Sequence, residues 1–250
     1  MLYRARLIAS HLRDYQRGRK AARLVSVPSA GQLLDQANPL AEYFDSIHEG
    51  PGIWKWRHYF EIYHRHLSRF VGTPVTLVEI GIYSGGSLPM WRNYFGSQSH
   101  IVGVDIEPAC TKYEAEGISV VIGDQADRSF WRAFRQEFPS VDVLIDDGGH
   151  APEQQMVTLE EMLPHIRPGG AYVCEDVHGD PNGFASFVAG IQAALHHAEF
   201  DGRLGSVPSA FQQSVSSVHS YPFVVVVEKA TAARERFVSE KHGSQWQPFL

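Results

Sequence analysis

Short apolar runs alternate with helix-like segments through the middle of the chain, from about residue 75 to residue 230. The expected strands cover residues 76–80, 100–105, 118–122, 141–145, 171–174 and 223–228, the last paired with 215–219. The expected helices between them cover residues 88–94, 130–138, 153–166 and 184–196. Strands that are apolar on both faces and alternate with helices form parallel sheets with right-handed crossovers. The pattern therefore predicts an α/β fold with helices on both faces of the sheet.

The first 70 residues follow a helical pattern instead. Residues 1–25 are typical of an exposed, basic amphipathic helix, and a second helical region spans 33–70, interrupted by the breaker cluster Glu49-Gly50-Pro51-Gly52. Aromatic residues at helical spacing after this break indicate a buried stripe, whereas His66 is expected on the helix surface. The predicted domains are an N-terminal helical extension or lid (1–69), a main domain (70–230) and a C-terminal tail (231–250).

Composition places the chain among ordinary globular proteins, because 250 residues with 44% hydrophobic and 20% charged side chains can bury one sizeable core. The net charge of −6 is unevenly distributed. Residues 1–23 carry seven basic side chains and one acidic one, whereas the rest of the chain carries 15 basic and 27 acidic side chains. An acidic main domain argues against a nucleic-acid partner. For the basic N-terminal helix, two roles stay open. It packs on its own domain or on another copy of the chain, or it binds a partner or a lipid surface.

Neither a membrane span nor a secretory signal is expected. No run approaches the roughly 20 apolar residues that a span needs, and Arg4 and Arg6 interrupt the apolar residues near the N-terminus. Cys110 and Cys174 lack the spacing of a metal or redox pair. These features predict a cytoplasmic protein with reduced cysteines.

A glycine-rich turn follows the first expected strand and leads into a helix, in the segment EIGIYSGGS at residues 79–87. Glycines permit a tight turn, and the N-terminus of the helix offers free N–H groups to a ligand. Asp105 ends the second strand, where a carboxylate can accept hydrogen bonds from both ribose hydroxyls of an adenosine. Gly123-Asp124-Gln125 follows the third strand.

The glycine spacing favours one cofactor over another. The turn has the spacing G-x-x-x-G, whereas binding of a dinucleotide pyrophosphate requires G-x-G-x-x-G. A ligand with one adenosine and no phosphate, S-adenosylmethionine, is therefore favoured over NAD. The predicted cofactor-binding residues are Glu79, Gly81, Tyr83, Ser84, Gly85, Ser87, Asp105, Asp124, Gln125 and, in a supporting role, Asp146.

Two acidic strand ends suggest a metal site. Asp147 follows the fourth strand, and Glu175 and Asp176 follow the fifth, which we expect to be its neighbour. Three carboxylates suit Mg²⁺ better than a soft metal. Because adjacent residues of a regular strand point to opposite faces, Glu175 and Asp176 can converge only where the strand has ended. His150, three residues beyond Asp147, is a candidate general base near neutral pH.

Five segments of residues 75–176 resemble class I S-adenosylmethionine-dependent methyltransferases, in particular the metal-dependent sugar O-methyltransferases of macrolides such as mycinamicin and macrocin. The segments are VEIGIYSGGSLPMWRNYF, IVGVDIEP, VIGDQAD, VLIDDGGH and PHIRPGGAYVCED. The resemblance implies a Rossmann-like fold with a seven-stranded, mostly parallel sheet that contains one antiparallel strand. It also implies that the positions of Asp147, Glu175 and Asp176 bind Mg²⁺ and that His150 is the base.

The predicted function is Mg²⁺-dependent transfer of a methyl group from S-adenosylmethionine to a hydroxyl of a small-molecule acceptor, a sugar unit of a glycosylated natural product. Residues 54–59 (WKWRHY) replace the GTDK stretch common in the family and are expected to shape the acceptor pocket. Two alternatives stay open. One is an NAD-type oxidoreductase, which the missing pyrophosphate turn disfavours, and the other is a non-catalytic cofactor-binding or scaffold protein.

Overall fold

The computed structural model describes residues 2–25, 37–179, 181–198 and 205–245. It divides into two units, residues 1–37 and residues 38–250. The first unit contains helix α1 (Leu2–Ala22), which confirms the helix expected in residues 1–25. The side chains of residues 12–25 are exposed. Part of the second expected helical region, up to residue 36, lies outside the described residues.

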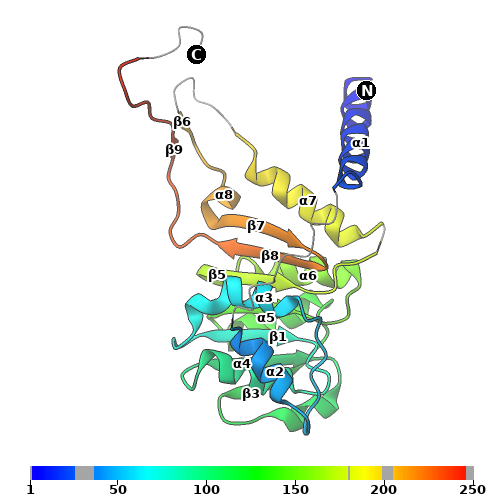
Figure 1. Ribbon diagram of the computed structural model, residues 1–250, viewed down its shortest axis with the longest axis vertical. Coiled ribbons are helices and arrows are strands. Elements are labelled where there is room, and N and C mark those ends of the chain that lie inside the picture. Colours follow the sequence, from blue (N-terminus) through cyan, green and yellow to red (C-terminus); the bar gives the residue numbers. More distant parts are fainter. Residues whose placement is uncertain (1, 26–36, 180, 199–204, 246–250) are drawn as a thin grey trace. The chain divides into compact units, whose positions relative to one another are not determined.

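A seven-stranded sheet organises the second unit, in the order β3-β2-β1-β4-β5-β8-β7 (Figure 1). The strands are β1 (Thr76–Ile80), β2 (His100–Asp105), β3 (Ile118–Ile122), β4 (Val141–Asp146), β5 (Ile166–Cys174), β7 (Val215–Tyr221) and β8 (Val224–Lys229). The first five strands pair in parallel, whereas β8 pairs antiparallel with both β5 and β7. The predicted mostly parallel sheet with one antiparallel strand is therefore confirmed.

Helices cover both faces of this sheet, with α3 and α4 in front of it and α5 and α6 behind it in Figure 1. The helices are α2 (Pro39–Ser46), α3 (Tyr59–Leu67), α4 (Ser87–Phe95), α5 (Arg128–Glu137), α6 (Pro152–Met162), α7 (Gly183–Leu195) and α8 (Ala210–Ser214), with short 3₁₀ helices η1 (Ser68–Phe70) and η2 (Pro108–Tyr113). Two further strands, β6 (Gly205–Ser206) and β9 (Phe237–Val238), form a separate small sheet. The sequence pattern missed η2, α8, β6 and β9.

Successive strand residues alternate between two hydrophobic cores, because side chains of a strand point to opposite faces. Leu77 packs on the face that carries α2, α3 and α4, whereas Val78 packs on the face that carries α5, α6 and α7. Trp91 and Trp131 are fully buried, one in each core. Burial of such side chains, at about 1.5–3 kcal/mol for each large aliphatic residue, fixes both helix layers on the sheet.

Helix α3 belongs to the first of these cores. Tyr59, Tyr63 and Leu67 follow one face of the helix and are all buried, as the aromatic stripe indicates. The expected surface position of His66 is wrong, because this side chain is also buried and faces strands β7 and β8. Its helical spacing from Tyr59 places it on the buried side of α3.

One expected turn lies inside a strand. The expected helix 153–166 and strand 171–174 leave Pro168-Gly169-Gly170 between them as a turn, but β5 already begins at Ile166. The pairing with β4 shifts between Val141 and Val143, so the three residues form an irregularity in β5 instead. Because β5 begins earlier, α6 ends at Met162 rather than at residue 166.

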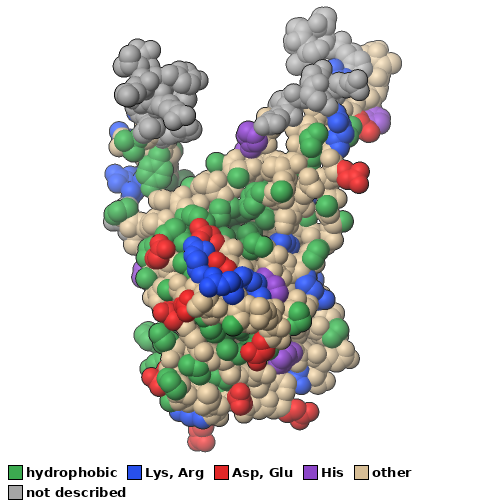
Figure 2. Space-filling model, turned by 180° about the vertical axis from the view of Figure 1, so that it is seen from behind, with side chains coloured by type: hydrophobic (Ala, Val, Ile, Leu, Met, Phe, Trp, Pro, Cys, Tyr) green, Lys and Arg blue, Asp and Glu red, His purple; other side chains and the backbone are tan. Residues whose placement is uncertain are grey.

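Charged side chains of both signs lie beside one another on the face shown in Figure 2. Arg128 of α5 forms ion pairs with Glu160 and Glu161 of α6, and Arg135 pairs with Glu161 at 2.8 Å. These pairs join two neighbouring helices rather than creating a surface of one sign. Among the described helices, none combines the length and the apolar composition needed to cross a bilayer.

Candidate active site

A cavity of about 990 Å³ lies beyond the carboxyl ends of the parallel strands. This is where ligands bind in open α/β sheets, because the loops that follow the strands diverge there. Its lining includes these predicted site residues: Gly81, Tyr83, Ser84, Ser87, Asp105, Asp124, Gln125, Asp147, His150, Glu175 and Asp176. Glu79, Gly85 and Asp146 do not line the cavity, and each supports a residue that does.

Two glycines of the predicted turn are required for close packing. A Cβ atom on Gly81, whose φ is +81°, would lie 2.1 Å from the backbone oxygen of Asp147. A Cβ atom on Gly85, whose φ is +72°, would overlap the ring of Tyr113. Glycine at these positions therefore lets the β1 turn approach the end of β4 and the wall of the cavity.

The carboxylate of Asp105 is held at the end of β2 by two backbone groups. It accepts hydrogen bonds from the N–H of Tyr83 at 3.1 Å and the N–H of Glu107 at 2.9 Å. Asp124 instead accepts the N–H of Ala126 at 2.8 Å, which forms a local turn. Asp105 is therefore the better placed of the two acids to bind a ribose.

Gln125 and Asp146 form a buried pair that orders the loop after β4. Gln125 donates to Asp146 at 2.9 Å and accepts the N–H of Gly149 at 2.7 Å. The hydroxyl of Tyr172 donates to the other oxygen of Asp146 at 2.9 Å. Burial raises the pKa of Asp146 to about 6, although both side-chain donors oppose this shift. These two predicted cofactor residues hold the residue 147–150 loop in place.

Lys55 is a site residue whose role the sequence patterns did not assign. Its side chain is only 3% exposed, and its Nζ atom lies 2.6 Å from Asp147, 3.0 Å from both oxygens of Glu175 and 3.3 Å from Glu79. Burial alone would lower the pKa of Lys55, but the three carboxylates outweigh it and raise this pKa well above its usual range. The sequence signal for a buried cation here was the excess of acidic residues at the strand ends, because buried carboxylates need a counter-charge.

Glu175, in the cavity lining, and Glu79, outside it, are both almost completely buried. Glu79 accepts a hydrogen bond from Ser87 at 2.5 Å, and Glu175 accepts one from the Tyr63 hydroxyl at 2.5 Å. Burial and the nearby Asp147 raise the pKa of Glu175 well above its usual range, and Lys55 opposes them. Glu175 is thus held by Lys55 and Tyr63, whereas Glu79 connects the ammonium to the β1 turn.

Asp176 and Glu175 both line the cavity, because β5 ends at Cys174 and the alternation of a regular strand no longer applies to them. Asp176 has a φ of +52°, in the left-handed region. The hydroxyl of Tyr59 and the indole N–H of Trp56 both donate to its Oδ1 atom, at 2.6 and 3.0 Å. Its Oδ2 atom faces His150, 3.6 Å from the Nε2 atom of that ring.

His150 completes this group from the loop after β4. Its Nε2 atom also lies 3.9 Å from Oδ1 of Asp147, and its φ of +56° turns the ring toward the cavity. Asp147, His150 and Asp176 each offer an atom within 4.8 Å of the others, a separation that one metal ion can bridge. Strained, non-glycine φ values at two of these residues are typical of functional sites.

The donors present fit a hard divalent cation. Glu79, Asp147, Glu175 and Asp176 are four acidic side chains around the single cation Lys55, so acidic groups are in excess. Lys55 contacts Oδ2 of Asp147, and the donors to Asp176 use Oδ1. The opposite oxygen of each of these two carboxylates therefore faces His150, where oxygen ligands of Mg²⁺ are expected.

An aromatic wall borders this group on one side. The ring of Phe223 lies 5.5 Å from that of Trp56 and 6.0 Å from that of His178, measured between ring centres. Trp54 lines the cavity and is 87% exposed. Large exposed aromatic side chains beside a cavity are typical of ligand-binding surfaces.

The chain is similar to known methyltransferases. Residues 78–177 match the family described as Methyltransferase domain. The 8-demethyl-8-alpha-L-rhamnosyl tetracenomycin-C 2'-O-methyltransferase of Streptomyces olivaceus is 29% identical over 203 residues, which cover 74% of this chain and 53% of that protein. Demethylmacrocin O-methyltransferase of Streptomyces fradiae is 31% identical over 198 residues, which cover 70% of this chain and 50% of that protein.

A solved structure shares the fold. The MycE methyltransferase of the mycinamycin pathway, in complex with Mg, SAH and mycinamycin VI, superposes with a TM-score of 0.64 at 24% identity. The match covers 78% of this chain and 54% of that one. The chain thus spans about half the length of the curated relatives it matches. The resemblance to class I sugar O-methyltransferases that the sequence segments indicated is confirmed, and so is the Rossmann-like fold.

Proposed function

We propose that this chain, whose methyltransferase domain resembles those of sugar O-methyltransferases, transfers a methyl group from S-adenosylmethionine to a hydroxyl of a glycosylated natural product in a Mg²⁺-dependent reaction. The observation that carries the proposal is the convergence of Asp147, His150 and Asp176 on one cavity at the strand ends. The names of the relatives support the acceptor class, because they include an O-methyltransferase of a rhamnosyl tetracenomycin-C, one of demethylmacrocin and one of mycinamicin VI.

The donor binds along the first two strands in this proposal. Asp105 accepts the ribose hydroxyls, because its carboxylate is already fixed by two backbone N–H groups. The glycine turn at Gly81 leaves room for the ligand against the backbone. The net negative charge around Asp147 favours a sulfonium cation over a ligand with phosphates.

The metal belongs to the carboxylates at the ends of β4 and β5. Asp147 and Asp176 would hold Mg²⁺ through the oxygens that face His150, whereas Glu175, the third expected ligand, is paired with Lys55. A bound Mg²⁺ supplies a Lewis acid that lowers the pKa of an acceptor hydroxyl. Tyr59 and Tyr63 hold Asp176 and Glu175 in orientation through their hydroxyls.

His150 takes the proton of the acceptor hydroxyl. Its Nε2 atom faces two carboxylates that stabilise the imidazolium formed by this transfer. The acceptor oxygen then attacks the sulfonium methyl group, and the C–S bond breaks as the new O–C bond forms. The chain contributes mainly by positioning donor and acceptor in line.

The acceptor lies against the aromatic side chains of the cavity lining, Trp54 and Trp56, the second of which packs on Phe223. Apolar ring faces suit the C–H faces of a sugar and an apolar aglycone, while the hydroxyls of the acceptor point to Asp147, His150 and Asp176.

That the N-terminal extension forms a contact between copies of the chain remains a prediction.

The test is a labelled-methyl assay of the purified chain with S-adenosylmethionine and a panel of glycosylated polyketides, free sugars and phenols. We expect methylation of a glycosylated acceptor in Mg²⁺ and none in a chelator. Titration calorimetry should detect binding of S-adenosylmethionine and not of NAD. Tight NAD binding alone, or chelator-resistant turnover by both Asp147→Ala and Glu175→Ala, would overturn the proposal.

A further inference from the structure

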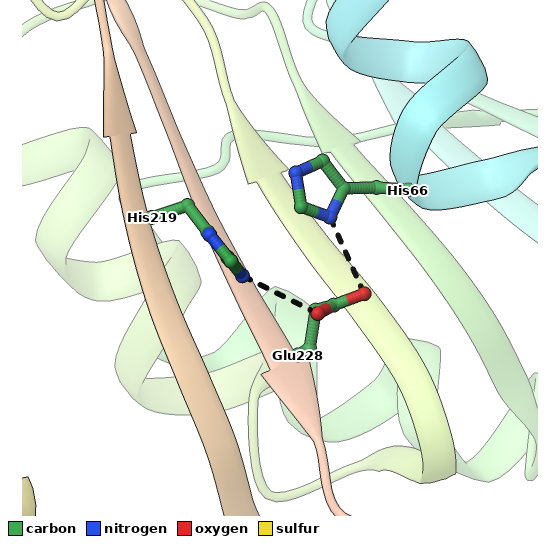
Figure 3. A group of neighbouring side chains, drawn as sticks. All are labelled: His66, His219 and Glu228. Atoms are coloured by element: carbon green, nitrogen blue, oxygen red, sulfur yellow. Dashed lines mark hydrogen bonds and ion pairs between the residues drawn. The ribbon is translucent and has the colours of Figure 1, made fainter.

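A second group of metal-ligand side chains lies outside the cavity. His66 of α3, His219 of β7 and Glu228 of β8 each offer an atom within 4.8 Å of the others (Figure 3). Figure 3 shows both imidazole rings directed at the carboxylate from opposite sides. None of the three lines the cavity of the candidate active site.

The separations in this group match the edges of a metal coordination shell. Nδ1 of His66 lies 3.3 Å from one oxygen of Glu228, and Nε2 of His219 lies 3.4 Å from the other. These distances are long for hydrogen bonds. Zinc bonds of about 2.0–2.2 Å to nitrogen and oxygen in a tetrahedral arrangement place neighbouring ligand atoms about 3.3–3.5 Å apart.

Glu228 has acceptor capacity left for a metal. Arg69 donates to one of its oxygens at 2.8 Å, and Ser217 donates to the other at 3.0 Å. An ionised carboxylate offers about four lone-pair sites. These two donors therefore leave a site on each oxygen, and each of those oxygens faces an imidazole.

The outer contacts are also those of a metal-bound histidine. Nε2 of His66 lies 2.9 Å from the hydroxyl of Tyr221, so the second ring nitrogen has a partner that fixes the ring. The Nε2 atom of His219, which would bind the ion, lies 3.0 Å from the Ser217 hydroxyl, so an ion bound here replaces this contact. The His219 side chain is 37% exposed, which provides a path from solvent.

We propose that His66, His219 and Glu228 bind a borderline divalent cation of the Zn²⁺ class, which joins α3 to the β7–β8 hairpin. Two imidazoles and one carboxylate suit Zn²⁺, whereas a set dominated by carboxylates suits Mg²⁺. The site is independent of the proposed methyl transfer. Its effect on the fold is to fix the helix that carries Tyr59 and Tyr63.

The test is calorimetric titration of the chelator-treated full chain with Zn²⁺, in the His150→Ala/Asp176→Asn background so that the candidate active site does not contribute. We expect one saturable Zn²⁺ site and a higher melting temperature with Zn²⁺ than with Mg²⁺. His219→Ala and Glu228→Gln should each weaken binding at least 100-fold. His100→Ala, which removes a half-buried imidazole bound to Ser119, is the matched control and should leave it unchanged.

Cobalt provides a second measurement that does not depend on stability. Co²⁺ bound at this site should show the visible absorption of a tetrahedral ion, and His66→Ala or His219→Ala should abolish it. If Zn²⁺ does not bind saturably in the double-variant background, or if His219→Ala and Glu228→Gln bind it as before, the group is a hydrogen-bonded network and the proposal is wrong. Neither outcome depends on whether the chain transfers methyl groups.

Discussion

The ammonium group of Lys55 lies 2.6 Å from Oδ2 of Asp147, although 92 residues separate them in the chain. The same ammonium contacts Glu175 and Glu79, so one cation serves three carboxylates in a nearly buried space. The orientation of these acids thus depends on a residue that precedes the first strand of the sheet in the sequence. This arrangement leads to the first prediction.

Lys55→Met should destabilise the protein by about 3–5 kcal/mol, because it leaves buried carboxylates that repel one another without their counter-charge. Chemical denaturation at pH 7 measures the free energy of unfolding. Lys20→Met, on the exposed surface of α1, is the control and should change it by less than about 0.5 kcal/mol. Equal stability of Lys55→Met and the parent protein would show that the ammonium does not hold these acids.

Asp146 should make stability fall as pH rises. Its pKa is about 6 in the folded protein and 3.8 when exposed, so the folded state binds the extra proton between these values. The stabilising contribution is present below pH 3.8 and is lost as pH rises through 6. Asp146→Asn removes it, so the stability of this variant relative to the parent should rise by about 2–3 kcal/mol from pH 4 to pH 7. A stability difference between Asp146→Asn and the parent that stays flat with pH would contradict the assignment.

Two glycine substitutions should change the free energy of unfolding in opposite directions. Gly81→Ala places a Cβ atom 2.1 Å from a backbone oxygen at a positive φ, so we expect a loss of at least about 2 kcal/mol. Gly190→Ala lies in α7 with nothing within 4 Å of the added Cβ, and should stabilise the protein by about 0.5–1 kcal/mol. Thermal unfolding of both variants gives the comparison. A neutral Gly81→Ala would mean that the β1 turn can move away from β4.

His150→Gln should reduce kcat about 10²–10⁴-fold if this side chain is the general base. Binding of S-adenosylmethionine, measured by calorimetry, should change little because the ring lies at the metal group. His48→Gln changes an exposed histidine and serves as the control. Full activity of His150→Gln near neutral pH would remove His150 from the mechanism.

The sequence pattern predicted the central sheet because strands with two buried faces have a strong signal. Asp105, Asp147 and Asp176 were found because the ends of parallel strands meet at one edge, a rule that needs no side-chain detail. The buried contacts between side chains from distant segments do not follow from this rule. Lys55 and Glu175 are 120 residues apart, and their contact depends on where an irregular segment crosses the cavity. His66 was expected on the surface although its helical spacing from Tyr59 marks the buried side of α3, and the sequence pattern gives no signal for the strands that this side chain faces.

Helix α3 limits how far the protein can be shortened. A fragment cut to residues 70–230 would retain every glycine and acid of the recognised segments. It would lack Lys55, Tyr59 and Tyr63, and so leave Glu175 and Asp176 without the donors that hold them. An expression fragment intended for binding or crystallisation work must therefore begin before residue 38, where α2 and α3 are still attached to the sheet they complete.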